Sequence, residues 1–136
     1  MSDLSAISGA RIFDCENWFD DAALLIEFGY VTGIVAKVDI PDHAERVVLD
    51  GGMIVPGFVD LQVNGGGGVL FNNATDVDSL QTLCAAHFPF GTVALLPTLI
   101  TDTREVTRAA LAAGIAAQQR RVKGFAGLHM EGPHLS

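Results

Sequence analysis

Residues 54–68 decide the fold of this chain and read Ile-Val-Pro-Gly-Phe-Val-Asp-Leu-Gln-Val-Asn-Gly-Gly-Gly-Gly. Pro56 and Gly57 interrupt whatever precedes them, and a short apolar run follows. The four glycines at the end leave the backbone almost free of steric restriction. We therefore predict a buried strand over residues 58–63 that runs directly into a loop.

Gln62 and Asn64 stand at the end of this predicted strand. Because they are two residues apart, they point to the same face of an extended chain. At the carboxyl end of a barrel strand that face looks into the mouth of the barrel, where two polar side chains indicate a binding site. The alternative is that both only cap the strand end, as turn residues often do.

Strands and helices alternate after the glycines. A capping pattern at Thr75 begins an apolar helical period that stops at Gly91, and a strand is predicted over residues 92–96. A second capping signal opens a helix over residues 102–120, and a third strand is predicted over residues 125–131. This alternation indicates βαβ units and a parallel sheet, in either a barrel or an open arrangement.

The first fifty residues have a different character, with short apolar runs and no helical period. We predict strands over residues 10–13, 22–28, 30–38 and 47–49, with a tight turn at Gly29. These strands are too few and too short to form a large core. We expect this all-β unit to lean on another part of the protein.

Composition excludes several classes of protein. The chain has 136 residues, is 49% hydrophobic and has a net charge of -8, which fits a folded globular protein and argues against nucleic-acid binding. No apolar run is long enough for a membrane span, and the start lacks a signal peptide, so we expect a cytoplasmic protein. The basic cluster Arg120-Arg121-x-Lys123 is expected at a helix end. Cys15 and Cys84 stand alone, which argues against a disulfide or a zinc knuckle.

Several other residues have ordinary structural interpretations. The glycine run lacks the third glycine of a dinucleotide loop and the Gly-Lys-Ser/Thr ending of a phosphate loop, so we do not expect nucleotide binding. Cys84 and His87 are three apart in a predicted helix and are expected to pack in the core rather than bind metal. His43 is expected to be exposed to solvent.

A second informative stretch, residues 127–135, reads Gly-Leu-His-Met-Glu-Gly-Pro-His-Leu. His129 and Glu131 alternate with apolar residues and share one face of the third predicted strand. An acid at the carboxyl end of a parallel strand lies where such enzymes keep their chemistry. Glu131 is thus a candidate metal ligand or acid-base group, or alternatively a salt-bridged rim residue. His134 is a ligand, a substrate contact or neither.

Three motifs together resemble the N-acetylglucosamine-6-phosphate deacetylase family of the amidohydrolase superfamily. They are Val-Pro-Gly-Phe-Val-Asp-x-Gln-x-Asn-Gly at 55–65, Leu-Pro-Thr at 96–98 and Gly-Leu-His-Met-Glu-Gly-Pro at 127–133. The resemblance implies an α/β fold with the first three units of a (β/α)8 barrel at residues 55–136 and part of a small β-sandwich at residues 1–54. It also implies hydrolysis of the acetamide of N-acetylglucosamine 6-phosphate and a homodimer, while the charge and the lack of a long apolar run predict no nucleic-acid or membrane partner.

The resemblance further implies where the catalytic groups lie. Glu131 matches the family's metal ligand. Gln62 and Asn64 stand where many amidohydrolases have His-x-His, and this replacement implies a single divalent ion, zinc or iron. Gln62, Asn64 and His134 are then expected to contact water or substrate. The histidine ligands and the general-base aspartate are expected beyond Ser136. A barrel of this type needs about 250 residues, so we expect a fragment that is inactive alone. The alternatives are an amidohydrolase acting on a cyclic amide or N-acyl amino acid, or a non-catalytic product.

Overall fold

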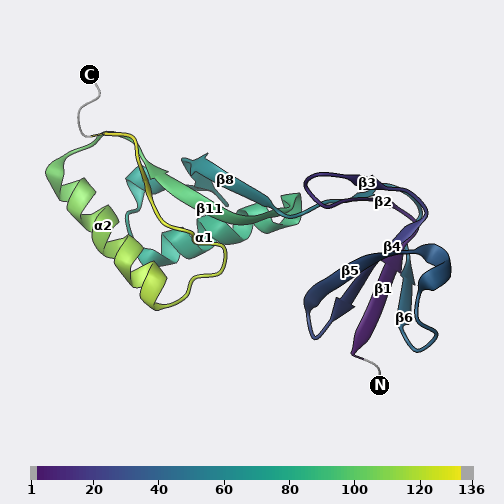
Figure 1. Cartoon of the computed structure of the whole chain (residues 1–136). Coiled ribbons are helices and arrows are strands. Elements are labelled where there is room, and N and C mark those ends of the chain that lie inside the picture. The colour runs from purple at the N-terminus through teal and green to yellow at the C-terminus, as the bar shows by residue number, and fades with distance from the viewer. Residues whose placement is uncertain (1–2, 133–136) are drawn as a thin grey trace. The chain divides into compact units, whose positions relative to one another are not determined.

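The chain forms two compact units in a computed structural model, which describes residues 3–132 (Figure 1). The units are Met1–Pro56, which is built of strands, and Gly57–Ser136, which holds both α-helices. The presence of both helices and strands confirms the mixed α/β class. The domain assignment that the resemblance implied, residues 1–54 and 55–136, stays a prediction, as does membership of an eight-stranded barrel and of a sandwich.

The larger sheet of the first unit has the strand order β5-β4-β1-β6. The central strand β1 pairs antiparallel with β4 and parallel with β6, and β4 forms a hairpin with β5 through the predicted turn at Gly29. The strands are β1 (Leu4–Ser8), β4 (Ala22–Glu27), β5 (Tyr30–Ala36) and β6 (Glu45–Val48). Strand β1 was not predicted, because Leu-Ser-Ala-Ile-Ser does not alternate regularly between apolar and polar residues.

A smaller sheet with the order β3-β2-β7 completes this unit. Its members are β2 (Arg11–Phe13), β3 (Trp18–Phe19) and β7 (Met53–Ile54), and a 3-10 turn, η1 (Lys37–Asp39), follows β5. The predicted strand over 30–38 therefore ends earlier, at Ala36. The core is small because its buried members are mostly short side chains: Leu4, Ala6, Ala23, Ile40 and Ala44.

The second unit is a parallel sheet with the order β12-β11-β8 and two helices. Neighbouring parallel strands are joined through a helix, as the spacing of the sequence predicted. The elements are β8 (Phe58–Val63), β9 (Gly65–Gly66), β10 (Val69–Leu70), η2 (Phe71–Asn73), α1 (Val77–His87), η3 (Phe88–Phe90), β11 (Thr92–Leu99), α2 (Arg104–Gln119) and β12 (His129–Met130). Within residues 3–132, no helix is both long enough and apolar enough to span a membrane.

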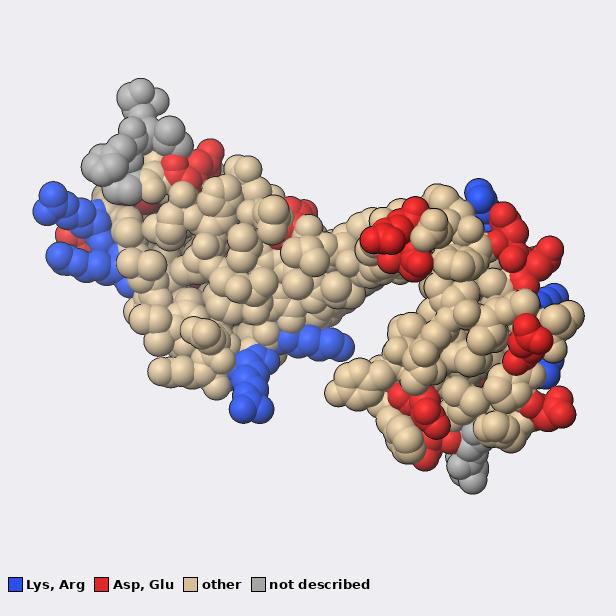
Figure 2. All heavy atoms as spheres, viewed as in Figure 1, with Lys and Arg blue, Asp and Glu red and all other residues tan. Residues whose placement is uncertain are grey.

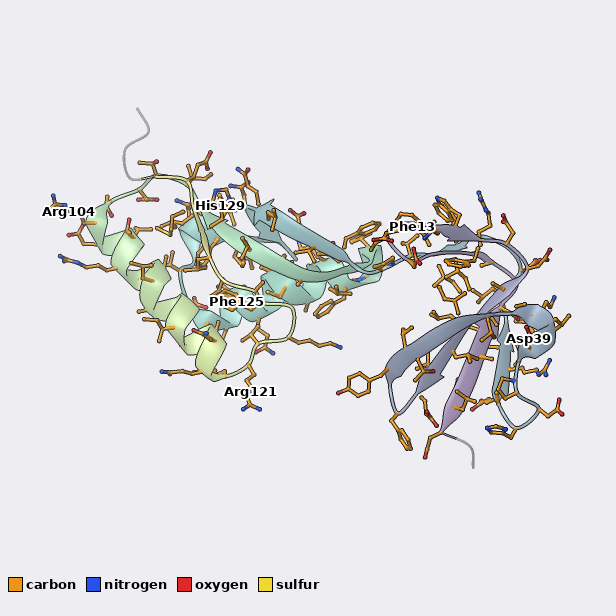
Figure 3. All side chains as sticks on the ribbon, viewed as in Figure 1. Phe13, Asp39, Arg104, Arg121, Phe125 and His129 are labelled. Carbon is orange, nitrogen blue, oxygen red and sulfur yellow. The ribbon has the colours of Figure 1, made fainter. Side chains whose placement is uncertain are left out.

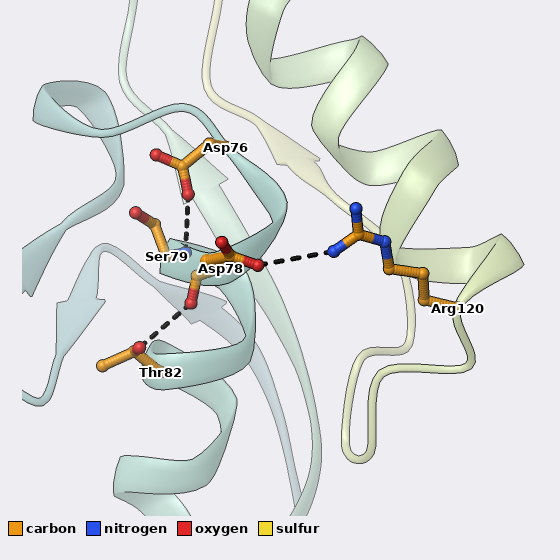
Figure 4. Close-up of polar contacts among 5 residues, drawn as sticks. All are labelled: Asp76, Asp78, Ser79, Thr82 and Arg120. Atoms are coloured by element: carbon orange, nitrogen blue, oxygen red, sulfur yellow. Dashed lines mark hydrogen bonds and ion pairs between the residues drawn. The ribbon is translucent and has the colours of Figure 1, made fainter.

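Each helix begins one residue later than its sequence signal predicted. Asp76, not Thr75, caps α1, and its side chain accepts a hydrogen bond from the Ser79 N–H at 2.7 Å (Figure 4). The α2 cap is Thr103, not Asp102, and it accepts from the N–H of the third helical residue. Both caps satisfy N–H groups that the first turn leaves unpaired.

The end of α2 carries the basic cluster, as predicted. Arg120 is the C-cap, and its guanidinium lies 3.4 Å from the Asp78 carboxylate at the start of α1 (Figure 4). Both side chains are largely exposed, so this ion pair contributes little to stability.

The third strand is shorter than the predicted range 125–131. Only His129–Met130 forms a regular ladder with β11, and Phe125 makes an isolated bridge with Leu95. Gly124 and Gly127 adopt φ values of 82° and 148°, which interrupt an extended strand. The segment before His129 therefore follows β11 as an irregular chain.

The helices cover one face of the three-stranded sheet. The apolar cluster between them contains Cys84 in its buried interior, as predicted, and burial raises the pKa of this thiol to about 11. The buried members are Val63, Phe71, Leu80, Leu83, Cys84, Leu95, Leu99, Ala110, Ala113 and Ala117. The opposite face of the sheet is left for the polar residues that the sequence singled out.

Candidate functional site

The carboxyl ends of the three parallel strands lie side by side. Val63 at the end of β8 pairs with Pro97 of β11, and the next β11 residue, Thr98, pairs with His129 of β12. Adjacent strands lie about 4.8 Å apart. Figure 3 labels His129 at this edge of the sheet. Residues from all three strands are therefore within reach of one small molecule.

Alternation along each strand puts the polar candidates on the face away from the helices. Val63, Leu99 and Met130 belong to or pack against the apolar cluster under α1 and α2. Successive side chains of an extended chain point to opposite faces, so the neighbours of these three residues point away from the helices. The polar ones among those neighbours are Gln62, Asn64, Thr98, His129 and Glu131.

Glu131 directly follows β12 and continues its ladder. Its N–H donates to the Leu99 carbonyl at 3.0 Å, which holds the backbone of Glu131 at the end of β11. The side chain is half-buried and makes no ion pair or hydrogen bond within residues 3–132. No residue within 3–132 forms a salt bridge with Glu131, and its role as a metal ligand or acid-base group stays a prediction.

His129 is oriented by a buried hydroxyl that the sequence did not single out. Thr98 is fully buried, and its Oγ1 donates to the Leu96 carbonyl at 3.3 Å while lying 3.5 Å from His129 Nδ1. This contact limits the rotation of the imidazole ring at β12. In a neutral imidazole one ring nitrogen donates and the other accepts, so the ring can offer one acceptor or ligand atom.

Hydrogen bonds on either side fix the backbone around Gln62 and Asn64. The Gln62 N–H donates to the Asp60 carboxylate at 3.1 Å, and the Asn64 carbonyl accepts from the Phe71 N–H at 3.0 Å. Phe71 is fully buried, so it anchors the loop that follows β8. The two amide side chains thus project from a backbone that is tied down at both ends.

The glycine run packs against α1. His87 Nε2 lies 3.1 Å from the Gly65 carbonyl, and a side chain at Gly66 would bring its Cβ within 2.7 Å of the same ring atom. The glycines therefore allow the backbone of this loop to approach α1 closely, which is a structural explanation for their presence. His87 was predicted to pack in the core; it is instead half-buried and contacts this loop. His43 is exposed, as expected.

The described residues do not form a complete metal site. Within residues 3–132 no group of three or more His, Cys, Asp or Glu side chains could hold an ion. Glu131 offers one carboxylate, and Gln62 and Asn64 offer neutral amide oxygens, which are weak ligands for zinc or iron. His134 lies outside the described residues. The donors fit one ligand of a metal centre, and the remaining ligands would have to come from elsewhere.

Known deacetylases are similar in sequence to this chain. No protein-family model matches the chain. It is 39% identical over 130 residues to an N-acetylgalactosamine-6-phosphate deacetylase of Shewanella sp., covering 94% of this chain and 33% of that protein. It is 31% identical over 116 residues to the N-acetylglucosamine-6-phosphate deacetylase of Haemophilus influenzae, covering 85% of this chain and 30% of that protein.

A solved structure has the same fold over nearly the whole chain. The N-acetylglucosamine-6-phosphate deacetylase of Pasteurella multocida superposes with a TM-score of 0.88 at 31% identity, covering 98% of this chain and 35% of that one. The chain thus spans about a third of the length of the curated relatives that it matches.

Proposed function

This chain is a homologue of the N-acetylglucosamine-6-phosphate deacetylases, consistent with an N-terminal portion of such an enzyme, and we propose that it contributes to the hydrolysis of an N-acetylated amino-sugar phosphate. In this reaction water adds to the acetyl carbonyl, the C–N bond breaks, the amine takes up a proton and acetate leaves. The observation that carries the proposal is that Gln62 and Asn64 at the end of β8 and His129 and Glu131 at the end of β12 lie on one face of the sheet, on either side of β11.

Two substrates are candidates, because the relatives are named for both. N-Acetylglucosamine 6-phosphate is the substrate named for the Haemophilus influenzae relative, and N-acetylgalactosamine 6-phosphate is named for the Shewanella relative, which has the higher identity of the two. These sugars differ only in the configuration at C4. The acetamide and the phosphate are common to both, so one catalytic arrangement serves either.

The residues of this chain take distinct roles in the proposed site. Glu131 would supply one carboxylate ligand to a divalent ion, and the other ligands and the general base would come from outside the described residues. Such an ion, when bound, polarises the acetyl carbonyl and lowers the pKa of a water molecule. The amides of Gln62 and Asn64 both donate and accept hydrogen bonds, and so can orient the water or the acetamide. His129 lies on the same face and can offer one ring nitrogen as an acceptor or ligand atom.

Charge distribution is compatible with an anionic substrate. Residues 1–56 contain ten acidic and three basic side chains, whereas residues 57–136 contain six acidic and five basic ones. Figure 2 shows acidic side chains gathered over the strands of the first unit and basic ones on the helical unit. The net charge of -8 therefore belongs mainly to the unit without the candidate site. The unit with the site carries nearly balanced charge and does not repel a phosphate strongly.

The test is acetate release by a full-length protein that carries this chain. Both sugar phosphates are offered separately, together with unphosphorylated N-acetylglucosamine, an N-acetyl amino acid and a cyclic amide as controls. We expect kcat/KM for one of the sugar phosphates to exceed that for every control. Turnover of the N-acetyl amino acid or the cyclic amide in preference to both sugar phosphates would replace this proposal with a different amidohydrolase activity.

The 136-residue chain is assayed beside it. We expect no acetate release, because residues 3–132 do not supply a complete metal site. Turnover that scales with the concentration of the purified chain would contradict this expectation.

A further inference from the structure

Asn72 connects two loops at the end of the sheet that carries the candidate site. Its Oδ1 accepts from the Ile100 N–H at 3.0 Å, and its Nδ2 donates to the Ile100 carbonyl at 3.0 Å. The same Nδ2 donates to Asp102 Oδ2 at 2.9 Å. One half-buried amide thus pairs with both backbone groups of Ile100, 28 residues away in sequence.

The loop that Asn72 holds is fixed at its other end by α2. Asp102 Oδ1 accepts from the Thr103 N–H at 2.7 Å, and Thr103 is the N-cap of the helix. The hydrogen bond from Asn72 is the main reason that the pKa of Asp102 lies below its ordinary value. Residues 100–103 are therefore held between the loop after β8 and the first turn of α2.

This loop in turn supports the backbone beside Glu131. Gly132 packs against Thr101 so closely that an added Cβ would collide with the threonine hydroxyl and lie 3.2 Å from Thr101 Cβ. On the other side of the carboxylate, the Glu131 N–H donates to the carbonyl of Leu99, directly before Ile100. The backbone of Glu131 and Gly132 therefore rests on the segment 99–101, which Asn72 holds at Ile100.

We propose that Asn72 is a positioning residue for Glu131. It sets the place of the loop after β11, and this loop sets the place of the carboxylate through Leu99 and Thr101. The importance of that placement for turnover rests on the proposed function, whereas the mechanical link does not. The hydrogen bonds that the structure gives the Asn72 side chain go to Ile100 and Asp102, not to Glu131.

The first measurement is amide hydrogen exchange of the 136-residue chain. Asn72→Ala removes all three hydrogen bonds, and we expect exchange at Ile100 and Glu131 to accelerate about tenfold. The matched control is Asn73→Ala, because Asn73 is exposed and the structure gives its side chain no hydrogen bond to another described residue. Unchanged exchange at Glu131 in Asn72→Ala, or equal acceleration in both variants, would overturn the proposal.

The second measurement is kinetic and uses the full-length protein. We expect Asn72→Ala to lower kcat by roughly ten- to a hundredfold with a smaller change in KM, as for other residues that orient a ligand. Asn72→Asp should also lose activity, because it brings a second carboxylate against Asp102. Adding Asp102→Asn restores a donor opposite that carboxylate, and the double variant should regain part of the kcat.

These outcomes separate the two proposals. A wild-type protein without deacetylase activity overturns the proposed function, while the exchange measurement still decides whether Asn72 holds the backbone of Glu131. An active wild-type protein whose kcat is unaffected by Asn72→Ala, or a double variant no better than Asn72→Asp, overturns the positioning role.

Discussion

Replacing Phe71 by Ala should destabilise the second unit more than any nearby surface change. Phe71 is fully buried among the residues between the sheet and the helices, directly after β10. Its removal loses the transfer free energy of a whole aromatic ring and leaves a cavity, at a cost of about 3–5 kcal/mol. A unit of this size is stabilised by about 4–12 kcal/mol in total, so the variant loses a large part of its stability.

The assay is urea unfolding followed by circular dichroism at 222 nm. Both α-helices lie in residues 57–136, so this signal reports the unfolding of the second unit. The matched control is Leu70→Ala, because Leu70 precedes Phe71 and is 41% exposed. We expect the control to lose less than about 1 kcal/mol.

One result of comparing Phe71→Ala with Leu70→Ala would contradict the burial of Phe71. A loss below about 1 kcal/mol for Phe71→Ala, with an unchanged denaturant slope, would mean that Phe71 does not fill the core as the structure has it. The Phe71 N–H also ties the loop to the Asn64 carbonyl. A correctly placed Phe71 therefore links the stability of the unit to the geometry of the site.

Three further predictions concern thiols, acid stability and metal content. Cys15 is exposed, whereas burial raises the pKa of Cys84 to about 11, so a thiol reagent at neutral pH should modify one cysteine in the native chain and two after unfolding; two fast-reacting native thiols would contradict this. The hydrogen bond from the Ser79 N–H lowers the pKa of Asp76 below its ordinary value of 3.8. The charged cap therefore stabilises α1 fully above pH 3.8, and this stabilisation is lost as the pH falls through the lower native pKa. Asp76→Asn should flatten this acid dependence of the unfolding free energy between about pH 2 and 6, and an unchanged profile would refute the prediction. Because Gln62 and Asn64 offer only neutral amide oxygens, a full-length protein loaded with excess zinc and desalted should retain one equivalent by elemental analysis, and two would be inconsistent with this.

Local sequence patterns were enough to predict the parallel sheet. The strand over 58–63 and the two helices were predicted from the apolar periodicity and from the proline and glycine residues that interrupt it. Both signals act within a few residues along the chain. The same local rules put Gln62 with Asn64, and His129 with Glu131, on common faces. Their convergence needed the register of β8, β11 and β12, which depends on pairing between distant segments.

Other features depended on contacts that a local pattern cannot contain. The helix caps shifted by one residue, because adjacent Asp and Thr side chains compete for the same N–H groups. The contact between Thr98 and His129 spans 31 residues, and the Asn72 bonds span 28 to 30. Asparagine in a loop is ordinarily read as a turn residue, so its role as a link between two loops required the structure.

The metal-binding role of Glu131 is tested by measuring bound metal and acetate release in the wild-type and Glu131→Gln forms of a full-length protein that carries this chain. The substitution keeps the size of the side chain and removes the negative charge that a divalent ion needs. We expect bound metal and acetate release from the amino-sugar phosphate to fall together in Glu131→Gln. Full metal occupancy with a nearly normal rate in Glu131→Gln would mean that Glu131 is a structural residue at the rim of the site. This result would contradict its role as a metal ligand.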